Sequence, residues 1–246
     1  MKKHPKPPQH EAGTPHVPQL PPAALELLAV EKHYGDAAAL EPLSLRIEPG
    51  QRVALLGHNG SGKTTLLRIA SGLLGPTAGD ITVFDNPAGS LRARAHLSYI
   101  ADNPTFYDDL SLWQHLEYVA RLHGVSKWDQ HAADLLDHLG LYERADDLPN
   151  SFSRGLRQKA AIAIAFVRPF ELLLVDEPFV GLDAAGKEAL LELLQQAHMD
   201  GAAQVVATHE LGFVNSVERL IALRDGALVY DGPPGDADVG ELVRQG

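Results

Sequence analysis

The stretch Gly57–Thr64 reads GHNGSGKT and constrains the fold of this chain most, because its glycines, lysine and threonine have the spacing of a phosphate-binding loop. Residues 52–56 before it predict a buried strand, and residues 65–70 after it predict a helix with an apolar stripe. In such a unit, backbone N–H groups and the positive end of the helix dipole converge on a phosphate. Lys63 is expected to reach the β- and γ-phosphates, and the Thr64 hydroxyl to ligate Mg²⁺. A glycine-rich turn that binds nothing is the alternative, which the flanking strand and helix disfavour.

A second feature is a pair of acidic residues directly after an apolar run. Residues 172–175 read Leu-Leu-Leu-Val, as expected for a central parallel strand, and Asp176 and Glu177 follow them. Side chains at the carboxyl ends of parallel strands face the ligand crevice. Asp176 is therefore placed to hold Mg²⁺ through water, and Glu177 to polarise a water that attacks the γ-phosphate. A plain solvated turn is the alternative, which the phosphate loop in the same chain disfavours.

Hydrophobic periodicity divides the chain of 246 residues into three parts. Residues 1–22 are rich in proline and histidine and predict a disordered tail. Residues 23–102 and 166–246 predict an α/β nucleotide-binding core of the P-loop NTPase type, with a RecA-like parallel sheet and an antiparallel β subdomain. Residues 103–165 predict an inserted helical subdomain. At finer detail we expect a loop over residues 75–79, helices over 157–166 and 211–217, and a final hairpin around residues 224–226.

The composition restricts which classes of partner and which cellular compartment we expect for this chain. The formal net charge is -11, which argues against a nucleic-acid partner, because such proteins usually present a basic face. There is no cysteine, so we expect neither disulfides nor thiolate metal sites, as fits a reducing cytoplasm. No apolar run approaches the roughly 18 residues that span a bilayer, and the first 22 residues lack the hydrophobic block of a signal peptide.

Further motifs accompany the phosphate loop and the acidic pair, and all of them together have a fixed order along the chain. They are Tyr34, the loop Gly57–Thr65, the hexapeptide Ser153–Gln158, the pair Asp176–Glu177, the tripeptide Gly181–Asp183 and His209. With them the chain resembles the nucleotide-binding subunit of the ATP-binding cassette (ABC) superfamily over about residues 25–232. This ordered set is far more specific than a phosphate loop alone.

The resemblance implies a role for each matched residue. It implies that Glu177, His209 and Lys63 are catalytic. It implies ATP contacts for Tyr34 (stacking on adenine), Gly57, His58, Asn59, Gly60, Ser61, Gly62, Lys63, Thr64, Thr65, Ser153, Gly155 and Asp183. It implies Mg²⁺ ligation for Thr64, Asp102 and Asp176. Ser153 and Gly155 would cap the γ-phosphate held by a second subunit, so that two chains enclose two ATP molecules head to tail.

Each residue considered alone has a plainer interpretation. A hydroxyl at a helix start is an ordinary N-cap, which explains Ser153 equally well. Tyr34 could be a half-buried aromatic without a ligand, and a single histidine such as His209 is more often structural. The full set of motifs favours the functional interpretation.

Two positions depart from the commonest family pattern. The hexapeptide Ser153–Gln158 matches the signature motif of the family, but it reads Ser-Arg-Gly-Leu-Arg-Gln and not the commonest form, Leu-Ser-Gly-Gly-Gln. This form of the motif is similar to that of exporter ATPases that pair with a separate membrane subunit. Asp102 stands where the family usually has a glutamine Mg²⁺ ligand. A carboxylate can also ligate Mg²⁺, although it adds negative charge beside the phosphates, and we expect Asp102 to keep the metal-sensing role.

The resemblance therefore implies an ATP-hydrolysing subunit of a transporter, with export favoured. It implies ATP and Mg²⁺ as cofactors, a separately encoded transmembrane permease, a homo- or heterodimer of nucleotide-binding domains, and a place on the inner face of the cell membrane. Residues 102–110 would form the segment that couples to the permease. One alternative is a non-transport ABC ATPase that acts on the ribosome or DNA, disfavoured by the single cassette, the short insertion and the acidic charge. A second alternative is a regulatory subunit with weak hydrolysis, and Asp102 is the one residue that favours it.

Overall fold

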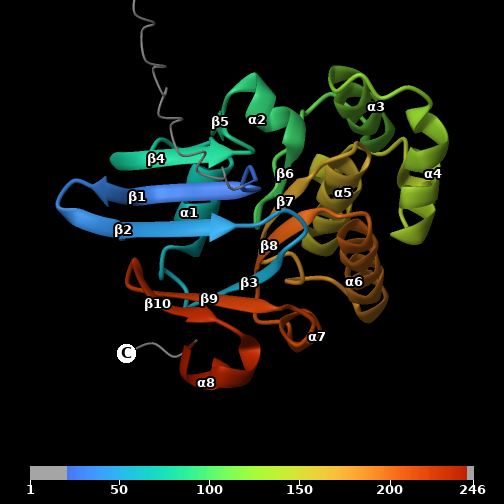
Figure 1. The fold of residues 1–246 in the computed structure, drawn as a ribbon. Coiled ribbons are helices and arrows are strands. Elements are labelled where there is room, and N and C mark those ends of the chain that lie inside the picture. Colours follow the sequence, from blue (N-terminus) through green and yellow to red (C-terminus); the bar gives the residue numbers. More distant parts are fainter. Residues whose placement is uncertain (1–20, 243–246) are drawn as a thin grey trace, which may run out of the picture.

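The computed structural model describes residues 21–242, and the predicted tail over residues 1–22 lies almost entirely outside them. The chain forms two sheets flanked by helices (Figure 1). The predicted class, an α/β protein with a parallel core sheet and a separate antiparallel sheet, is confirmed. None of the helices in this described range is long and apolar enough to cross a membrane.

The smaller sheet is antiparallel and has the strand order β2-β1-β4-β5. Its strands are β1 (Leu25–Tyr34), β2 (Ala37–Ile47), β4 (Ala78–Val83) and β5 (Asn86–Pro87). The predicted loop over residues 75–79 extends two residues too far, because β4 already begins at Ala78. There Ala78 pairs with Glu31, and Gly79, with a φ of 87°, packs against the backbone of β1.

The larger sheet has the order β10-β9-β3-β8-β7-β6, in which only β10 is antiparallel to its neighbour. Its strands are β3 (Arg52–Leu56), β6 (Leu97–Ile100), β7 (Leu172–Asp176), β8 (Ala203–Ala207), β9 (Arg219–Arg224) and β10 (Ala227–Gly232). Strands β3, β7 and β8 are buried along their whole length, as expected for a parallel sheet covered on both faces. The carboxyl ends of β3, β6 and β7 meet at one edge, where the candidate site lies.

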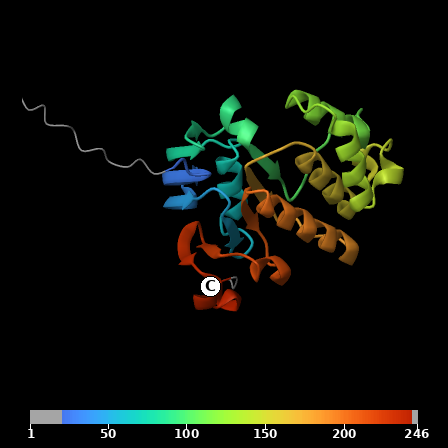
Figure 2. The ribbon, with the colours of Figure 1, turned by 45° about the vertical axis from the view of Figure 1, so that its right-hand side comes forward.

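Helices cover both faces of the larger sheet and form a group beside it (Figures 1 and 2). They are α1 (Lys63–Ala70), α2 (Leu91–His96), α3 (Leu112–Leu122), α4 (Trp128–His138), α5 (Arg154–Phe166), α6 (Ala184–Met199), α7 (Leu211–Val214) and α8 (Val239–Leu242). Residues 21–242 also contain the short 3₁₀ helices η1 (Tyr142–Arg144), η2 (Pro149–Ser151) and η3 (Pro234–Asp236). Helices α3, α4 and α5 pack against one another on one side of the molecule.

Two helix predictions need correction, and one helix was not predicted. Helix α5 begins at Arg154 and not at Arg157, because the Ser153 hydroxyl caps its first turn. Helix α7 ends at Val214 and not at Val217, because Ser216 donates both its N–H and its hydroxyl to the carbonyl of Phe213. Helix α2 had no sequence prediction, since six residues with alternating arginines give too weak a periodicity.

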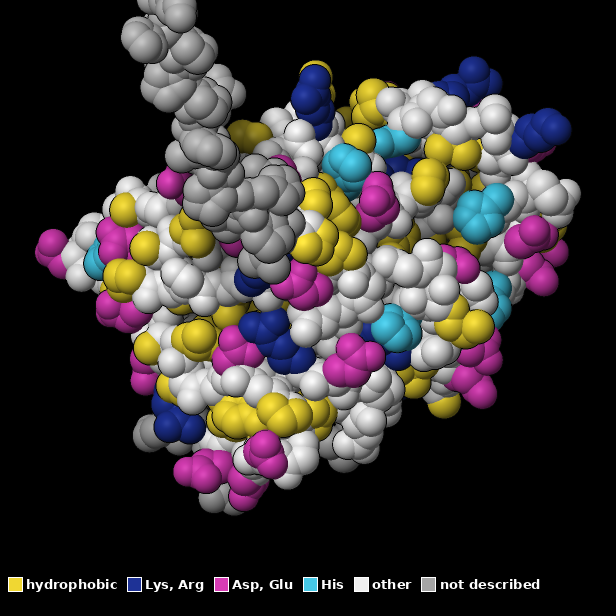
Figure 3. Space-filling model, in the orientation of Figure 1, with side chains coloured by type: hydrophobic (Ala, Val, Ile, Leu, Met, Phe, Trp, Pro, Cys, Tyr) yellow, Lys and Arg dark blue, Asp and Glu magenta, His cyan; other side chains and the backbone are white. Residues whose placement is uncertain are grey.

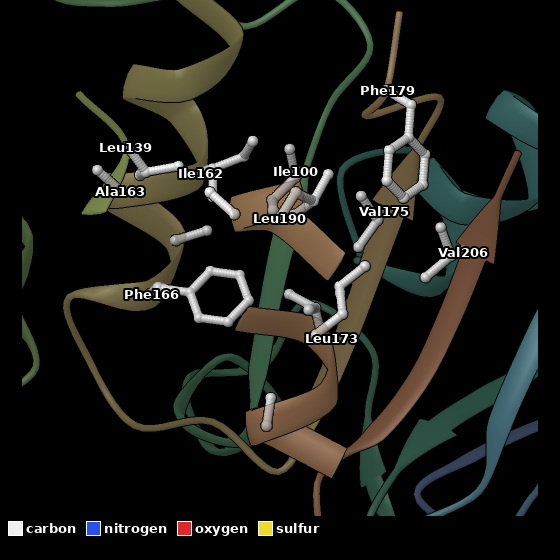
Figure 4. Packing of buried hydrophobic residues seen from close by; sticks show 14 of the residues in the cluster. Ile100, Leu139, Ile162, Ala163, Phe166, Leu173, Val175, Phe179, Leu190 and Val206 are labelled. Atoms are coloured by element: carbon white, nitrogen blue, oxygen red, sulfur yellow. The ribbon is translucent and has the colours of Figure 1, made fainter. Parts of the chain in front are cut away.

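Strand β7 joins two hydrophobic clusters because its side chains alternate between the faces of the sheet. Leu173 and Val175 pack toward α5 and α6, beside Phe166 and Leu190 (Figure 4). Leu172 and Leu174 belong to the opposite cluster, which includes the apolar side of α1. Full burial of each such side chain contributes about 1.5–3 kcal/mol, so the strand that ends in Asp176 is firmly held.

Candidate active site

The loop after β3 wraps around the start of α1, as the sequence predicts. Gly57 and Gly62 have φ angles of 145° and 106°, which favour glycine. A Cβ at Gly57 would collide with the Leu223 carbonyl, and one at Gly62 would lie 2.8 Å from the Ala39 carbonyl. These two glycines therefore allow the loop to pack tightly against β9 and β2.

The turn between β9 and β10 supports this loop from outside. The N–H of Gly226 donates to the carbonyl of Ser61 at 3.1 Å, and the N–H of Glu41 donates to the Gly226 carbonyl at 3.0 Å. The Nε2 atom of His58 lies 3.3 Å from an oxygen of Asp225. The sequence analysis missed this support, because the contact joins residues far apart in the chain.

A cavity of about 220 Å³ lies between the loop and the ends of β6 and β7. It brings together most of the predicted ATP and metal residues. Its lining consists of Ala39, His58, Asn59, Gly60, Ser61, Gly62, Lys63, Thr64, Thr65, Asp102, Asp176 and Glu177. Of these, only Ala39 was not predicted as a site residue or within a predicted motif.

Lys63 is 6% exposed and its ammonium group lies inside the loop. Its Nζ atom donates to the carbonyl of Gly57 at 2.6 Å and to that of His58 at 3.3 Å. It also lies 3.6 Å from an oxygen of Glu177. The lysine is thus held by backbone carbonyls at the base of the cavity, with a carboxylate next to it.

Asp176 is the most unusual group in the cavity. It is 1% exposed, and the Thr64 hydroxyl approaches its carboxylate, although neither oxygen has a hydrogen bond of ordinary geometry among the described residues. Burial raises the pKa of its carboxyl above the ordinary value. A buried carboxylate without a partner is costly, so this position is suited to a bound cation.

Glu177 continues the chain in a left-handed backbone conformation with a φ of 45°. Its N–H donates to the carbonyl of Ala207 at 2.8 Å, which fixes the turn after β7. One carboxylate oxygen lies 3.3 Å from Nε2 of His209. A positive φ at a residue other than glycine is sparsely populated and clusters at functional sites.

The donor set fits Mg²⁺. The Thr64 hydroxyl and the carboxylates of Asp102 and Asp176 line the same cavity and are hard oxygen donors, and the orphaned oxygens of Asp176 would gain a partner. Within residues 21–242 no group of three or more His, Asp or Glu side chains could hold a metal by itself. Because Mg²⁺ is usually bound by one or two carboxylates together with phosphate oxygens, this arrangement suits a metal that arrives with a nucleotide.

Five predicted ATP contacts lie outside the cavity lining, namely Gly57 at the start of the phosphate loop and four residues that lie elsewhere. Tyr34 ends β1 and is 55% exposed, with the Lys32 ammonium 5.3 Å from its ring centre. Ser153 caps α5 by accepting the N–H of Leu156 at 3.4 Å. Gly155, in the same first turn, lies so close to the Gly181 carbonyl that a Cβ there would collide with it. Asp183 caps α6 and pairs with Lys159 at 3.0 Å, and that lysine lowers the pKa of its carboxyl.

The face of the molecule seen in Figure 3 carries mixed charge. On the face shown in Figure 3, acidic, basic and hydrophobic side chains are interspersed wherever the described residues are visible. With a net charge of -11, the protein does not attract a phosphate anion through its overall charge. Phosphate binding at this site would depend on local donors, namely the loop N–H groups, the start of α1 and Lys63.

Comparisons with known proteins agree with this geometry. The family model described as ABC transporter matches residues 40–180. The SkfA peptide export ATP-binding protein SkfE of Bacillus subtilis is 35% identical over 84% of this chain and 88% of its own length. The ABC-type transporter ATP-binding protein EcsA of the same organism is 37% identical over 72% of this chain and 74% of its own length.

Solved structures show the same fold. An ATP-binding subunit of an ABC transporter superposes with a TM-score of 0.83 at 29% identity, over 89% of this chain and 97% of that one. The ATP-binding cassette MJ0796, in a dimeric post-hydrolysis state bound to ADP and Pi, superposes with a TM-score of 0.77 at 25% identity. That match covers 85% of this chain and 98% of the neighbour.

Proposed function

The chain belongs to the ABC transporter family, and we propose that it binds ATP with Mg²⁺, hydrolyses it and thereby drives export through a separate membrane protein. The observation that supports this most is the convergence of Lys63, Asp176 and Glu177 on one cavity below the phosphate loop. The oxygens of Asp176 lack a partner there, as expected for a group that awaits a cation.

Each residue contributes a distinct step to the proposed hydrolysis. The loop N–H groups and Lys63 would hold the β- and γ-phosphates, while Thr64, Asp102 and Asp176 would hold Mg²⁺, which neutralises phosphate charge. Glu177 would accept a proton from the attacking water, and His209, 3.3 Å from it, would orient that carboxylate and contact the γ-phosphate. Tyr34 would stack on adenine.

The second half of the ATP site would come from another copy or a similar subunit. Ser153 and Gly155 lie at an uncovered helix start outside the cavity of their own chain. Together with Asp183, they would close over the nucleotide of the partner in an ATP-bound dimer. The dimeric form of the related cassette MJ0796 supports this part of the proposal.

A groove of about 620 Å³ beside the site is suited to a helix of the membrane partner. It lies between β6 and the helical segment, and its lining includes Phe106, Tyr107 and Tyr118. The segment around Tyr107, between β6 and α3, is held in place by His115, whose Nε2 accepts the N–H of Tyr107 at 2.9 Å. Partly exposed aromatic side chains on a segment that is held in place favour burial by a partner, and residues 102–110 would transmit movement to that partner.

Arg168 closes one end of the same groove. Its guanidinium donates to the backbone carbonyls of Arg94, Ala95, Leu97 and Pro169. Burial lowers the pKa of Arg168 to about 10, so the group remains charged at neutral pH. The cation ties the end of α2 and the first residue of β6 to the segment that follows α5, which gives the groove a rigid wall.

The test is to purify the chain with an affinity tag from membranes of its own cells in mild detergent. A stoichiometric membrane protein with several spans should co-purify, and the sample should hydrolyse ATP only with Mg²⁺. Recovery of ribosomal proteins or nucleic acid in place of a membrane protein would contradict the transport role. The Asp102→Ala variant tests the metal assignment, because unchanged Mg²⁺ dependence would remove Asp102 from the metal site.

A further inference from the structure

Asp102 has both of its carboxylate oxygens engaged by neighbouring side chains. One oxygen lies 3.1 Å from Nη2 of Arg154, and the other accepts a hydrogen bond from the Asn103 side chain at 2.7 Å. Asp102 also lines the cavity that contains Asp176 and Glu177. The same side chain therefore faces the proposed metal position and an arginine outside it.

Arg154 connects this carboxylate to a distant part of the chain. It is the first residue of α5, and the Gly181 loop packs against the same turn. Arg157, one turn further, donates to the carbonyl of Pro104 at 3.0 Å. Two arginines of a single helix thus hold the segment 102–104 that follows β6.

The charges in the cavity make this contact sensitive to a cation. Three carboxylates line the cavity, from Asp102, Asp176 and Glu177. Glu177 has Lys63 and His209 nearby, and Asp102 has Arg154. Asp176 lies near Lys63 and the Thr64 hydroxyl, but among the described residues it has neither an ion pair nor a hydrogen bond of ordinary geometry. A divalent ion at Asp176 would attract the Asp102 carboxylate and compete with the guanidinium for it.

We propose that Asp102 and Arg154 form a latch that Mg²⁺ opens, with Arg154 acting as a positioning residue for Asp102. Without metal, the ion pair holds α5 against the end of β6. With Mg²⁺ and ATP in the cavity, the carboxylate turns to the metal, and the first turn of α5 is no longer tied by this ion pair to the segment after β6, while the rest of α5 stays packed on the sheet. This inference rests on the proposed function, because it requires that Mg²⁺ and ATP bind at this cavity.

The first experiment titrates Mg²⁺ into purified protein with a fluorescent ATP analogue and follows anisotropy. Arg154→Gln should lower the Mg²⁺ concentration at half-saturation by about two- to five-fold, since an exposed ion pair no longer competes. Arg154→Lys, which restores the charge, should return it toward the wild-type value. Arg144→Gln removes an arginine of another exposed ion pair, Arg144–Asp147 at 3.3 Å, and serves as the matched control.

A double-mutant cycle separates the contact from general electrostatics. In an Asp102→Asn background, Arg154→Gln should leave the Mg²⁺ midpoint unchanged, because the pair is already broken. If the shift persists in that background, Arg154 acts on the metal through its charge alone and the latch is wrong. The side chain of Arg154 is 61% exposed, so this substitution is not expected to disturb folding.

The second experiment measures the movement itself. The chain has no cysteine, so Ser126→Cys and Asp80→Cys place two spin labels at exposed sites, one between α3 and α4 and one on β4. With ATP and a chelator, the wild type should show one inter-label distance, and Mg²⁺ should change it. Arg154→Gln should show the changed or a broadened distribution without metal.

The outcomes separate the two proposals. If the wild type binds the ATP analogue with Mg²⁺ but Arg154→Gln shifts neither the midpoint nor the distance, the latch is overturned and the proposed function stands. If the wild type shows no Mg²⁺-dependent binding, the proposed function fails and the latch fails with it.

Discussion

The two halves of the candidate ATP site are built in different ways. The half around Lys63 and Asp176 is buried, and backbone contacts hold it in place between the ends of β3 and β7. The half around Ser153 and Arg154 is exposed, and side-chain contacts of one helix start hold it. The difference indicates a rigid half that holds phosphate and metal, and a half that can move at low energetic cost.

The largest expected effect is on hydrolysis, in the rigid half. Glu177→Gln should lower kcat for ATP by about 10²–10⁴-fold, because the variant loses the proposed general base. The amide keeps the shape of the side chain, so ATP binding should persist and the ATP-bound dimer should accumulate. Phosphate release and light scattering with ATP measure the two effects.

Glu171→Gln, at an exposed acid that pairs with His96, provides the control for this substitution. A Glu177→Gln protein that hydrolyses ATP at the wild-type rate would contradict the role of Glu177. One that remains monomeric with ATP would contradict the two-halves arrangement.

Lys63→Met should weaken ATP binding by about 10- to 100-fold, because it removes a charge-assisted hydrogen bond to phosphate. Such a bond contributes roughly 1.5–3 kcal/mol to binding. The methionine keeps the apolar part of the side chain in its buried position. Calorimetry with ATP and Mg²⁺ measures the change, and Lys187→Met, whose partner is Glu210, is the control. Equal affinity of Lys63→Met and the wild type would show that the loop N–H groups suffice.

Asp176→Asn should stabilise the metal-free protein by about 1–3 kcal/mol at neutral pH, because it removes a buried carboxylate without a partner. Burial raises the pKa of this carboxyl in the folded state above its ordinary value of 3.8. The folded wild type therefore loses stability as the pH rises from 3.8 through the raised pKa, because the carboxyl must then ionise while buried. The gain of the variant should therefore be smallest in acid and grow with pH. Denaturant unfolding at several pH values measures it.

Metal provides the control for this prediction. Mg²⁺ with ATP should stabilise the wild type and have much less effect on Asp176→Asn. A variant that is less stable than the wild type at neutral pH would show that the Asp176 carboxylate already has a favourable partner.

The smallest effect is expected in the exposed half. Ser153→Ala removes the N-cap of α5 and should cost about 1 kcal/mol of stability. ATP binding to one chain should remain unchanged, whereas the ATP-bound dimer of Glu177→Gln should weaken when Ser153→Ala is added. If Ser153→Ala weakens ATP binding to the monomer, the two halves act within one chain and the comparison fails.

The sequence predicted the rigid half well because its elements are local. The apolar runs of β3 and β7 end directly at Gly57 and Asp176, so periodicity and motif spacing place both at one sheet edge. The same reasoning predicted α5 and the cap at Ser153, although not the first residue of the helix. The roles assigned to these residues stay predictions until the variants are measured.

The contacts between distant segments could not be predicted from one sequence. Nothing in the residues around Asp102 indicates that Arg154 reaches its carboxylate, since the contact depends on how α5 packs beside β6. The lack of a partner at Asp176 is also a property of the folded chain, because it depends on every neighbour in the cavity. Short elements such as α2 are defined by a single cap at Ser90 and by tertiary contacts.

The turn between β9 and β10 has a practical consequence for protein engineering. Its tip is open to solvent at Asp225, so it looks like a harmless place for a fused reporter or an inserted peptide. Yet Gly226 joins the phosphate loop to β2 through two backbone hydrogen bonds. A dye attached at Asp225 would therefore respond to changes in the phosphate loop. A peptide inserted at Asp225 would disturb the position of that loop and with it the candidate ATP site.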